Sequence, residues 1–249
     1  MKKIISLILI LACIILLPSC NSGGGGIFGT DYKEITNNIF TKYIEMNVSI
    51  ITEHKSGTKS YKSQGSGVIY AKDNNHYYIL TNHHVVDPDS DFTETSYTVY
   101  DCYGNDYRGT FIHSDESYDL AVIRIVRGSK GLYTAPLASK DLKKGDEIAV
   151  LSNSNNLLNS VTYGEILDYA PVETHDKHGN VDKNVNFAVF WHNAPMWDGG
   201  SGSVLLNMNM ELVGVNYAVA KDNNGNFLYG FAIGVSRVRE YLENNNLMK

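Results

Sequence analysis

Short apolar runs separated by polar turns follow one another along most of the chain. They are rich in Val, Ile, Tyr and Phe, and segments such as Asp73-Asn74-Asn75 and Gly104-Asn105-Asp106 separate them. Because β-branched and aromatic residues favour extended backbone while Asn, Asp and Gly favour turns, the pattern predicts strands. The expected strands are Val48–Thr52, Gly67–Tyr70, Tyr77–Thr81, Tyr97–Tyr100, Leu120–Ile125, Glu147–Leu151, Ser160–Tyr169, Val185–Phe190, Ser203–Leu206, Leu212–Ala220 and Phe227–Ile233.

Two segments instead carry apolar residues at helical spacing. Asp31–Tyr43 has Ile35 and Ile39 on one face and predicts a short N-terminal helix, and Val235–Asn244 predicts a closing helix. The apolar face of the closing helix is formed by Val238, Tyr241 and Leu242. About twelve strands without βαβ spacing therefore favour an all-β fold, either an antiparallel double barrel or a sandwich.

The N-terminus has the pattern of a targeting segment. Lys2-Lys3 precede the apolar run Ile4–Leu17, which is shorter than the roughly 20 residues that a membrane-spanning helix needs. Leu17-Pro18-Ser19-Cys20 resembles a bacterial lipobox, in which the signal is cut before a cysteine that is then lipidated. An ordinary cleaved signal and an uncleaved anchor are the alternatives.

These features divide the chain into three parts. Residues 1–19 are expected to be a lipoprotein signal peptide, and residues 20–30 the lipidated Cys20 with a Gly-rich tether. Residues 31–249 are expected to form one folded domain without an internal linker. The protein would then lie in the bacterial cell envelope, outside the cytoplasm and attached to a membrane through its lipid.

Composition narrows the possible partners. The 249 residues are 43% hydrophobic and 19% charged, which suits a folded chain with a full core. A net charge of −6 and the absence of Lys/Arg clusters argue against a nucleic-acid surface. Cys102 is the only cysteine expected in the folded part, so no disulfide is expected there. The histidines lack metal-site spacing, so neither a metal nor an organic cofactor is expected.

A serine set among glycines is the strongest candidate for chemistry. In Trp197–Ser203, glycines lie on both sides of Ser201 and let the backbone turn sharply. If Ser201 is a nucleophile, the N–H groups of Gly199 and Ser201 are placed to form an oxyanion hole. The alternative is a flexible surface loop.

Two strand ends offer the groups that such a serine needs. His84 follows the apolar strand that ends at Thr81, and Asp119 precedes the strand that begins at Leu120. A histidine can take the proton of Ser201, and a buried carboxylate can orient that histidine. Each residue taken alone has a structural reading: His84 as a satisfied strand-end histidine, Asp119 as a turn acid and Ser201 as a loop serine. The order His, Asp, Ser along a β-rich chain favours the catalytic reading.

Five motifs resemble the trypsin-like serine peptidases of bacteria, especially the protease domain of the HtrA group. They are Gly65–Ile69, Leu80–Val86, Asp119–Ile123, Gly199–Ser203 and Gly230–Ile233, within a match from about Met46 to Leu242. The resemblance implies a chymotrypsin-like fold of two six-stranded antiparallel Greek-key barrels. It also implies His84 as general base, Asp119 as its orienting acid and Ser201 as nucleophile, with His83 on the neighbouring non-catalytic position.

The chain departs from the family pattern at four positions. Gly200 replaces the usual Asn or Asp, which leads us to expect a less rigid loop and less fixed oxyanion donors. Ser203 and Val204 replace a common Gly and Pro, and this variant is similar to the glutamyl endopeptidase branch. That branch has a His where this chain has Asn216, so Glu specificity is not expected. We also expect no PDZ domains.

By the same resemblance, the primary pocket has two walls. They are formed by Tyr217, Ala218 and Val219 and by Gly230, Phe231 and Ala232, with a floor near Pro195 and Met196. The absence of a carboxylate there favours apolar side chains.

The expected function is therefore a secreted, lipid-anchored serine endopeptidase that acts on proteins or peptides through an acyl-enzyme. A trypsin-fold lipoprotein with impaired catalysis, acting as a binding module, is the alternative. An esterase with the same triad fits the chemistry but not the order of the motifs.

Replacing Cys20 with Ser tests the lipid anchor. Without the thiol no thioether to a lipid can form, so we expect Cys20→Ser to move from the detergent phase to the aqueous phase when the full chain is made in bacteria. Cys13→Ser, which changes a cysteine inside the apolar run, should stay in the detergent phase. The lipid-anchor prediction is wrong if both variants partition as the original chain does.

Overall fold

The computed structural model describes residues 32–87, 92–128, 131–154, 157–175 and 181–249. The expected signal peptide, Cys20, the tether and Asp31 lie outside these residues. None of the helices in the described part is long and apolar enough to cross a membrane.

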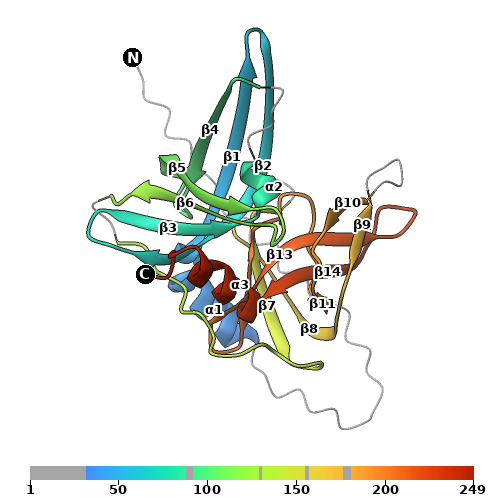
Figure 1. The fold of residues 1–249 in the computed structure, drawn as a ribbon. Helices are drawn as coiled ribbons and strands as arrows, with labels where there is room; N and C mark the ends of the chain where they lie inside the picture. The colour runs from blue at the N-terminus through green and yellow to red at the C-terminus, as the bar shows by residue number, and fades with distance from the viewer. Residues whose placement is uncertain (1–31, 88–91, 129–130, 155–156, 176–180) are drawn as a thin grey trace, which may run out of the picture.

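Two closed antiparallel β-barrels form the molecule (Figure 1). The strands of the first barrel are β1 (Asn47–Ser56), β2 (Lys59–Lys72), β3 (His76–Thr81), β4 (Glu94–Tyr100), β5 (Asp106–Asp115) and β6 (Leu120–Val126). Their order around the barrel is β1-β2-β3-β6-β5-β4. The strands of the second barrel are β7 (Glu147–Ser152), β8 (Ser160–Ala170), β11 (Val189–His192), β12 (Val204–Asn207), β13 (Leu212–Lys221) and β14 (Phe227–Gly234), in the order β11-β14-β13-β12-β7-β8. The prediction of two six-stranded antiparallel barrels is confirmed.

Three strands of the first barrel are buried on both faces. Alternate side chains of a strand point to opposite faces, and in β2, β3 and β6 neighbouring residues belong to different apolar clusters. Ile69, Ile79 and Ile123 pack in the core of the first barrel, whereas Val68, Leu80 and Val122 belong to the cluster that also fills the second barrel. β3 and β6 are therefore largely apolar runs, whereas β2 is buried only over residues 65–71 and begins with exposed residues. These buried stretches hold the two barrels together.

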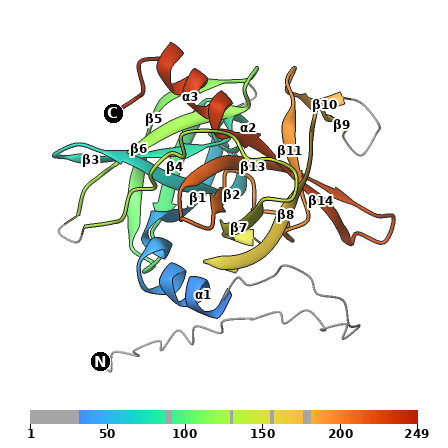
Figure 2. The same ribbon diagram turned by 90° about the horizontal axis from the view of Figure 1, so that it is seen from below.

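The helices lie outside the barrels (Figure 2). The expected N-terminal helix is α1 (Tyr32–Thr41), followed by the 3₁₀ turn η1 (Tyr43–Met46), and Tyr32 donates a hydrogen bond to Glu147 at 2.7 Å. The closing helix α3 (Val235–Asn244) has the predicted bounds and buries Val238, Tyr241 and Leu242. The Tyr241 hydroxyl donates to the His113 carbonyl at 3.2 Å, so α3 lies against the second barrel, which it follows in sequence, and also contacts the first.

Several strand predictions need correction. The strand expected at Val185–Phe190 begins at Val189, because a bend at Asn186 and Phe187 separates it from the short strand β10 (Val181–Asn184), which pairs with β9 (Glu173–His175). The hydrophobic pattern of the sequence did not predict β5. Only Gly109 is buried along β5, so backbone pairing to β4 and β6, rather than an apolar face, defines it.

Candidate active site

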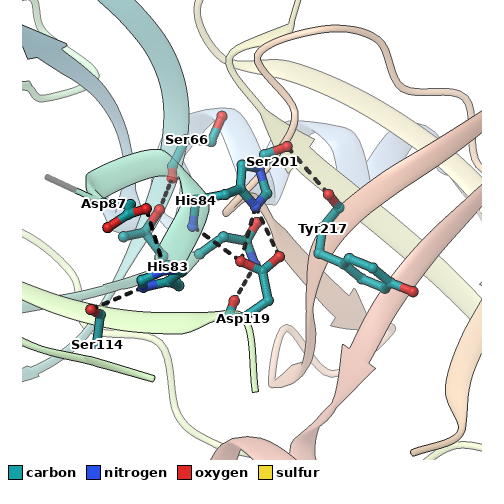
Figure 3. A network of polar contacts seen from close by, with 10 residues as sticks. Ser66, His83, His84, Asp87, Ser114, Asp119, Ser201 and Tyr217 are labelled. Atoms are coloured by element: carbon teal, nitrogen blue, oxygen red, sulfur yellow. Dashed lines mark hydrogen bonds and ion pairs between the residues drawn. The ribbon is translucent and has the colours of Figure 1, made fainter. Parts of the chain in front are cut away.

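His84 lies in α2 (His83–Val86), a single helical turn that follows β3. Asp119 lies just before β6 and is 4% exposed. Its carboxylate accepts from the His84 backbone N–H at 3.1 Å, and its two oxygens lie 3.0 and 2.8 Å from His84 Nδ1 (Figure 3). A carboxylate accepts hydrogen bonds, so Nδ1 is the donor in this pair, and Nε2 is the ring nitrogen that remains to accept a proton.

Asp119 reaches this position through an unusual backbone conformation. Its φ is +48°, a left-handed value that Asp tolerates better than most residues. Its N–H closes a turn onto the Glu116 carbonyl at 3.0 Å, and its own carbonyl accepts from the buried Asn82 side chain at 2.9 Å. Asn82 is adjacent to α2, so this bond fixes the two strand ends relative to each other.

Two consecutive turns shape the Ser201 loop. Gly200 N donates to Trp197 O at 2.9 Å, and Ser203 N donates to Gly200 O at 3.0 Å. The third residue of each turn has positive φ, +87° at Gly199 and +82° at Gly202. Such turns favour Gly at this place, since other L-residues rarely adopt this φ. The backbone conformation therefore favours glycine at positions 199 and 202.

Ser66 of the first barrel holds this loop of the second barrel. Its N–H donates to Ser201 O at 2.8 Å, and its hydroxyl donates to Gly199 O at 2.8 Å. The same hydroxyl accepts from Asn153 N at 2.9 Å. A Cβ on Gly202 would overlap Ser66 O, so the backbones at Gly202 and Ser66 lie closer together than any residue but glycine would allow.

Four backbone N–H groups of the loop, those of Trp197, Asp198, Gly199 and Ser201, have no acceptor among the residues that the structure describes. Gly200, Gly202 and Ser203 all donate their N–H to carbonyls. Among the described residues, no acceptor is found for the N–H of Gly199 or of Ser201. These are the two donors expected to form the oxyanion hole.

The Ser201 hydroxyl is half-buried and has a weak contact. It donates to the Tyr217 carbonyl at 3.4 Å, near the limit for a hydrogen bond. In Figure 3 the His84 ring is drawn between Asp119 and Ser201. The structure thus places the three predicted residues near one another, with Asp119 bonded to His84 and the Ser201 hydroxyl bonded to the Tyr217 carbonyl.

Gly200 occupies a closely packed position. A Cβ there would lie 2.7 Å from Met196 Cε, 2.9 Å from Trp197 O and 3.0 Å from Ser154 Oγ. The carbonyl of Trp197 accepts from Gly200 N itself, so it has little freedom to move. Glycine fits this site sterically, and the family's Asn would require its neighbours to shift.

The residues expected to line the primary pocket lie on adjacent strands. Ala218 pairs with Phe231 and Val219 pairs with Gly230 across β13 and β14. Tyr217 and Phe231 are buried, at 1% and 5% exposure, whereas Ala218 and Val219 are half-buried.

His192 is a residue next to this region that the sequence did not single out. It is fully buried, and its Nε2 lies 2.8 Å from the Asn216 side-chain oxygen. Burial lowers the pKa of His192 from its ordinary value of 6.5 to about 4, against the opposing effect of the hydrogen bond to Asn216. The ring is therefore neutral at neutral pH. The sequence alone does not mark His192 as a functional residue, because its pairing with Gly230 on the neighbouring strand is known only from the structure.

In the described ranges no cluster of three His, Cys, Asp or Glu side chains is arranged to hold a metal ion.

Comparisons with known proteins agree with this geometry. The family model of the trypsin-like peptidase domain matches residues 65–215. The chain is 31% identical over 183 residues to the periplasmic serine endoprotease DegP of Escherichia coli, covering 73% of this chain and 35% of that protein. It is 32% identical over 205 residues to a serine protease HtrA-like protein of Staphylococcus haemolyticus, covering 79% and 30%. It is 32% identical over 191 residues to the serine protease PepD of Mycobacterium tuberculosis, covering 71% and 39%. The chain thus spans less than half the length of these relatives.

The buried neutral His192 predicts a loss of stability in mild acid. Its folded-state pKa lies below the ordinary value, so the unfolded chain binds the proton first as pH falls. The contribution of the neutral His192 ring to the free energy of unfolding is therefore complete above about pH 6.5 and is lost progressively toward pH 4. Between pH 7 and pH 5 it should remove about 2 kcal/mol from the free energy of unfolding.

Urea unfolding of the wild type and of His192→Gln at both pH values measures this effect. Gln cannot titrate, so the variant should lose about 2 kcal/mol less than the wild type between pH 7 and pH 5. Equal losses in both proteins would show that His192 does not titrate differently in the folded and unfolded states.

Proposed function

The chain belongs to the trypsin-like peptidase family, and from that premise we propose that it is a serine endopeptidase with Ser201 as nucleophile, His84 as general base and Asp119 as the acid that orients His84. The observation that carries the proposal is the pairing of two features of the site. Asp119 holds His84 by its backbone N–H and by Nδ1, and within the described ranges the Gly199 and Ser201 N–H groups have no acceptor.

The first chemical step uses the free lone pair of His84. The Ser201 hydroxyl turns from the Tyr217 carbonyl toward Nε2 of His84, which removes its proton as Oγ attacks the peptide carbonyl. Asp119 stabilises the imidazolium that forms, and the ring then gives its proton to the departing amine. Water repeats the sequence on the acyl-enzyme, which releases the acid and restores Ser201.

The oxyanion of each tetrahedral intermediate needs two fixed donors. The N–H groups of Gly199 and Ser201 supply them, and each such donor contributes roughly 10²–10³ in rate. The Ser201 N–H shares a peptide plane with the Gly200 carbonyl, which accepts from Ser203 N at 3.0 Å, and the positive φ of Gly199 orients the N–H of Gly199 relative to the rest of the loop. A donor fixed before the reaction requires no reorganisation during it.

The substrates we propose are proteins or peptides with an apolar side chain before the scissile bond. Tyr217, Ala218, Val219, Gly230 and Phe231 line the pocket for that side chain, and none of them carries a charge.

The proposed location is the bacterial cell envelope outside the cytoplasm. Relatives from Escherichia coli, Buchnera and Haemophilus influenzae are named as periplasmic proteases. The apolar N-terminal segment and Cys20 support secretion and a lipid anchor.

The adjacent histidines provide a matched test of the catalytic assignment. His84 bonds to Asp119, whereas His83 lies 3.0 Å from Ser114 Oγ and 3.6 Å from the Asp87 carboxylate. We expect His84→Ala to lower kcat/KM on an unfolded protein substrate by at least about a thousandfold. His83→Ala should lower it by less than about threefold, because the variant loses only a partly exposed contact.

Circular dichroism of both variants shows whether each has kept its fold. The assignment is contradicted if two folded variants lose activity equally. A folded wild type that binds the protein substrate without cleaving it would instead favour the binding module.

A further inference from the structure

The His192 ring crosses the strand that carries Gly230. The strands lie in the order β11-β14-β13, with His192 on β11 opposite Gly230 on β14. From β11 the ring reaches Asn216 on β13, where Nε2 lies 2.8 Å from Oδ1. A Cβ on Gly230 would overlap Cε1 and Nε2 of the ring. The ring therefore occupies the space into which a side chain at position 230 would point.

This space belongs to the region where the primary pocket is expected. Gly230 pairs with Val219, and its neighbour Phe231 pairs with Ala218, so both expected walls meet beside the ring. Met196, on the expected floor, is 1% exposed. The ring and Gly230 are thus buried beside the half-buried Val219, which pairs with Gly230.

A buried hydrogen-bond network holds the ring in place. The Asn216 side-chain N–H groups donate to Ser203 Oγ at 3.0 Å and to Ser203 O at 3.3 Å. This leaves the Asn216 oxygen to accept from His192 Nε2. His192, Asn216 and Ser203 are all fully buried. Swinging the ring out of the pocket would leave buried polar groups unsatisfied, at a cost of roughly 1–3 kcal/mol each.

We propose that His192 forms the floor of the primary pocket and restricts the enzyme to substrates with a small side chain, such as Ala, before the scissile bond. The proposal rests on the function proposed above and narrows the apolar preference by size. A longer side chain meets the imidazole, because the network keeps the ring over Gly230. The ring is neutral, so it offers no positive charge to attract an acidic side chain in place of a small one.

The first experiment uses the wild type and a fluorogenic peptide series that differs only in the residue before the scissile bond. We expect kcat/KM for Ala to exceed the values for Leu and Phe by at least about tenfold. Comparable values for Ala and Leu, or a preference for Phe, would overturn the proposal.

The second experiment removes the floor. His192→Ala should raise kcat/KM for Leu relative to Ala by at least about tenfold, because the space over Gly230 opens. Added imidazole should enter this space and restore the preference for Ala. The matched control is His54→Ala, which removes a histidine that is 4% exposed in the first barrel and should leave the preference unchanged.

A fluorophosphonate that labels Ser201 separates the two proposals. If the wild type is not labelled, the proposed function fails, and the role of His192 fails with it. If wild type and His192→Ala are both labelled but share one substrate profile, only the role of His192 is overturned. Should His192→Ala fail to fold, the wild-type series alone decides.

Discussion

The contact on which the site depends is the set of hydrogen bonds that Ser66 makes between the barrels. Ser66 is fully buried, and its N–H and hydroxyl bind the carbonyls of Ser201 and Gly199. Its own carbonyl accepts from Thr81 Oγ1 at 2.7 Å, and Thr81 ends the strand that leads to His84. Ser66 therefore connects the backbone of the Ser201 loop to β3, the strand that leads into α2 and His84. A second bond between the barrels runs from Asn47 Nδ2 at the start of β1 to Asn153 Oδ1 just after β7, at 3.0 Å.

Close backbone packing lets this junction form. Gly199 and Gly202 supply positive φ, and Gly202 also allows Ser66 to approach. On the side of the second barrel, the Asn216 carbonyl accepts from Gly202 N at 2.8 Å and the Asn216 side-chain N–H donates to Ser203 Oγ. The loop is therefore held by bonds to both barrels. Buried polar groups are costly unless they are satisfied, and here they bond to one another along the loop. The rigidity of the site thus comes from the same bonds that make its burial possible.

Much of this could be predicted from the sequence, and the rest required spatial contacts. Strands buried on both faces, such as β3 and β6, are visible as apolar runs, and the closing helix is visible from Val238, Tyr241 and Leu242. The polar strand β5 could not be predicted from the hydrophobic pattern, because it is held by backbone hydrogen bonds to β4 and β6 and not by an apolar face. His84, Asp119 and Ser201 were identified by their order and motifs, whereas Ser66 and His192 matter through partners far away in the chain. The packing at Gly200 likewise depends on Met196 and Ser154, which no local pattern reveals.

The most direct test of the central claim is the rate at which a fluorophosphonate labels the folded protein, with the labelled residue identified by peptide mapping. The account predicts one label, on Ser201, that is absent from the urea-unfolded chain. It also predicts that folded Ser66→Ala is labelled at least about tenfold more slowly, since the variant loses the bond that fixes the Gly199 carbonyl. The matched control Ser96→Ala changes an exposed serine of β4 and should react at the wild-type rate. Labelling of Ser66→Ala at the wild-type rate, or labelling of another residue, would contradict the account.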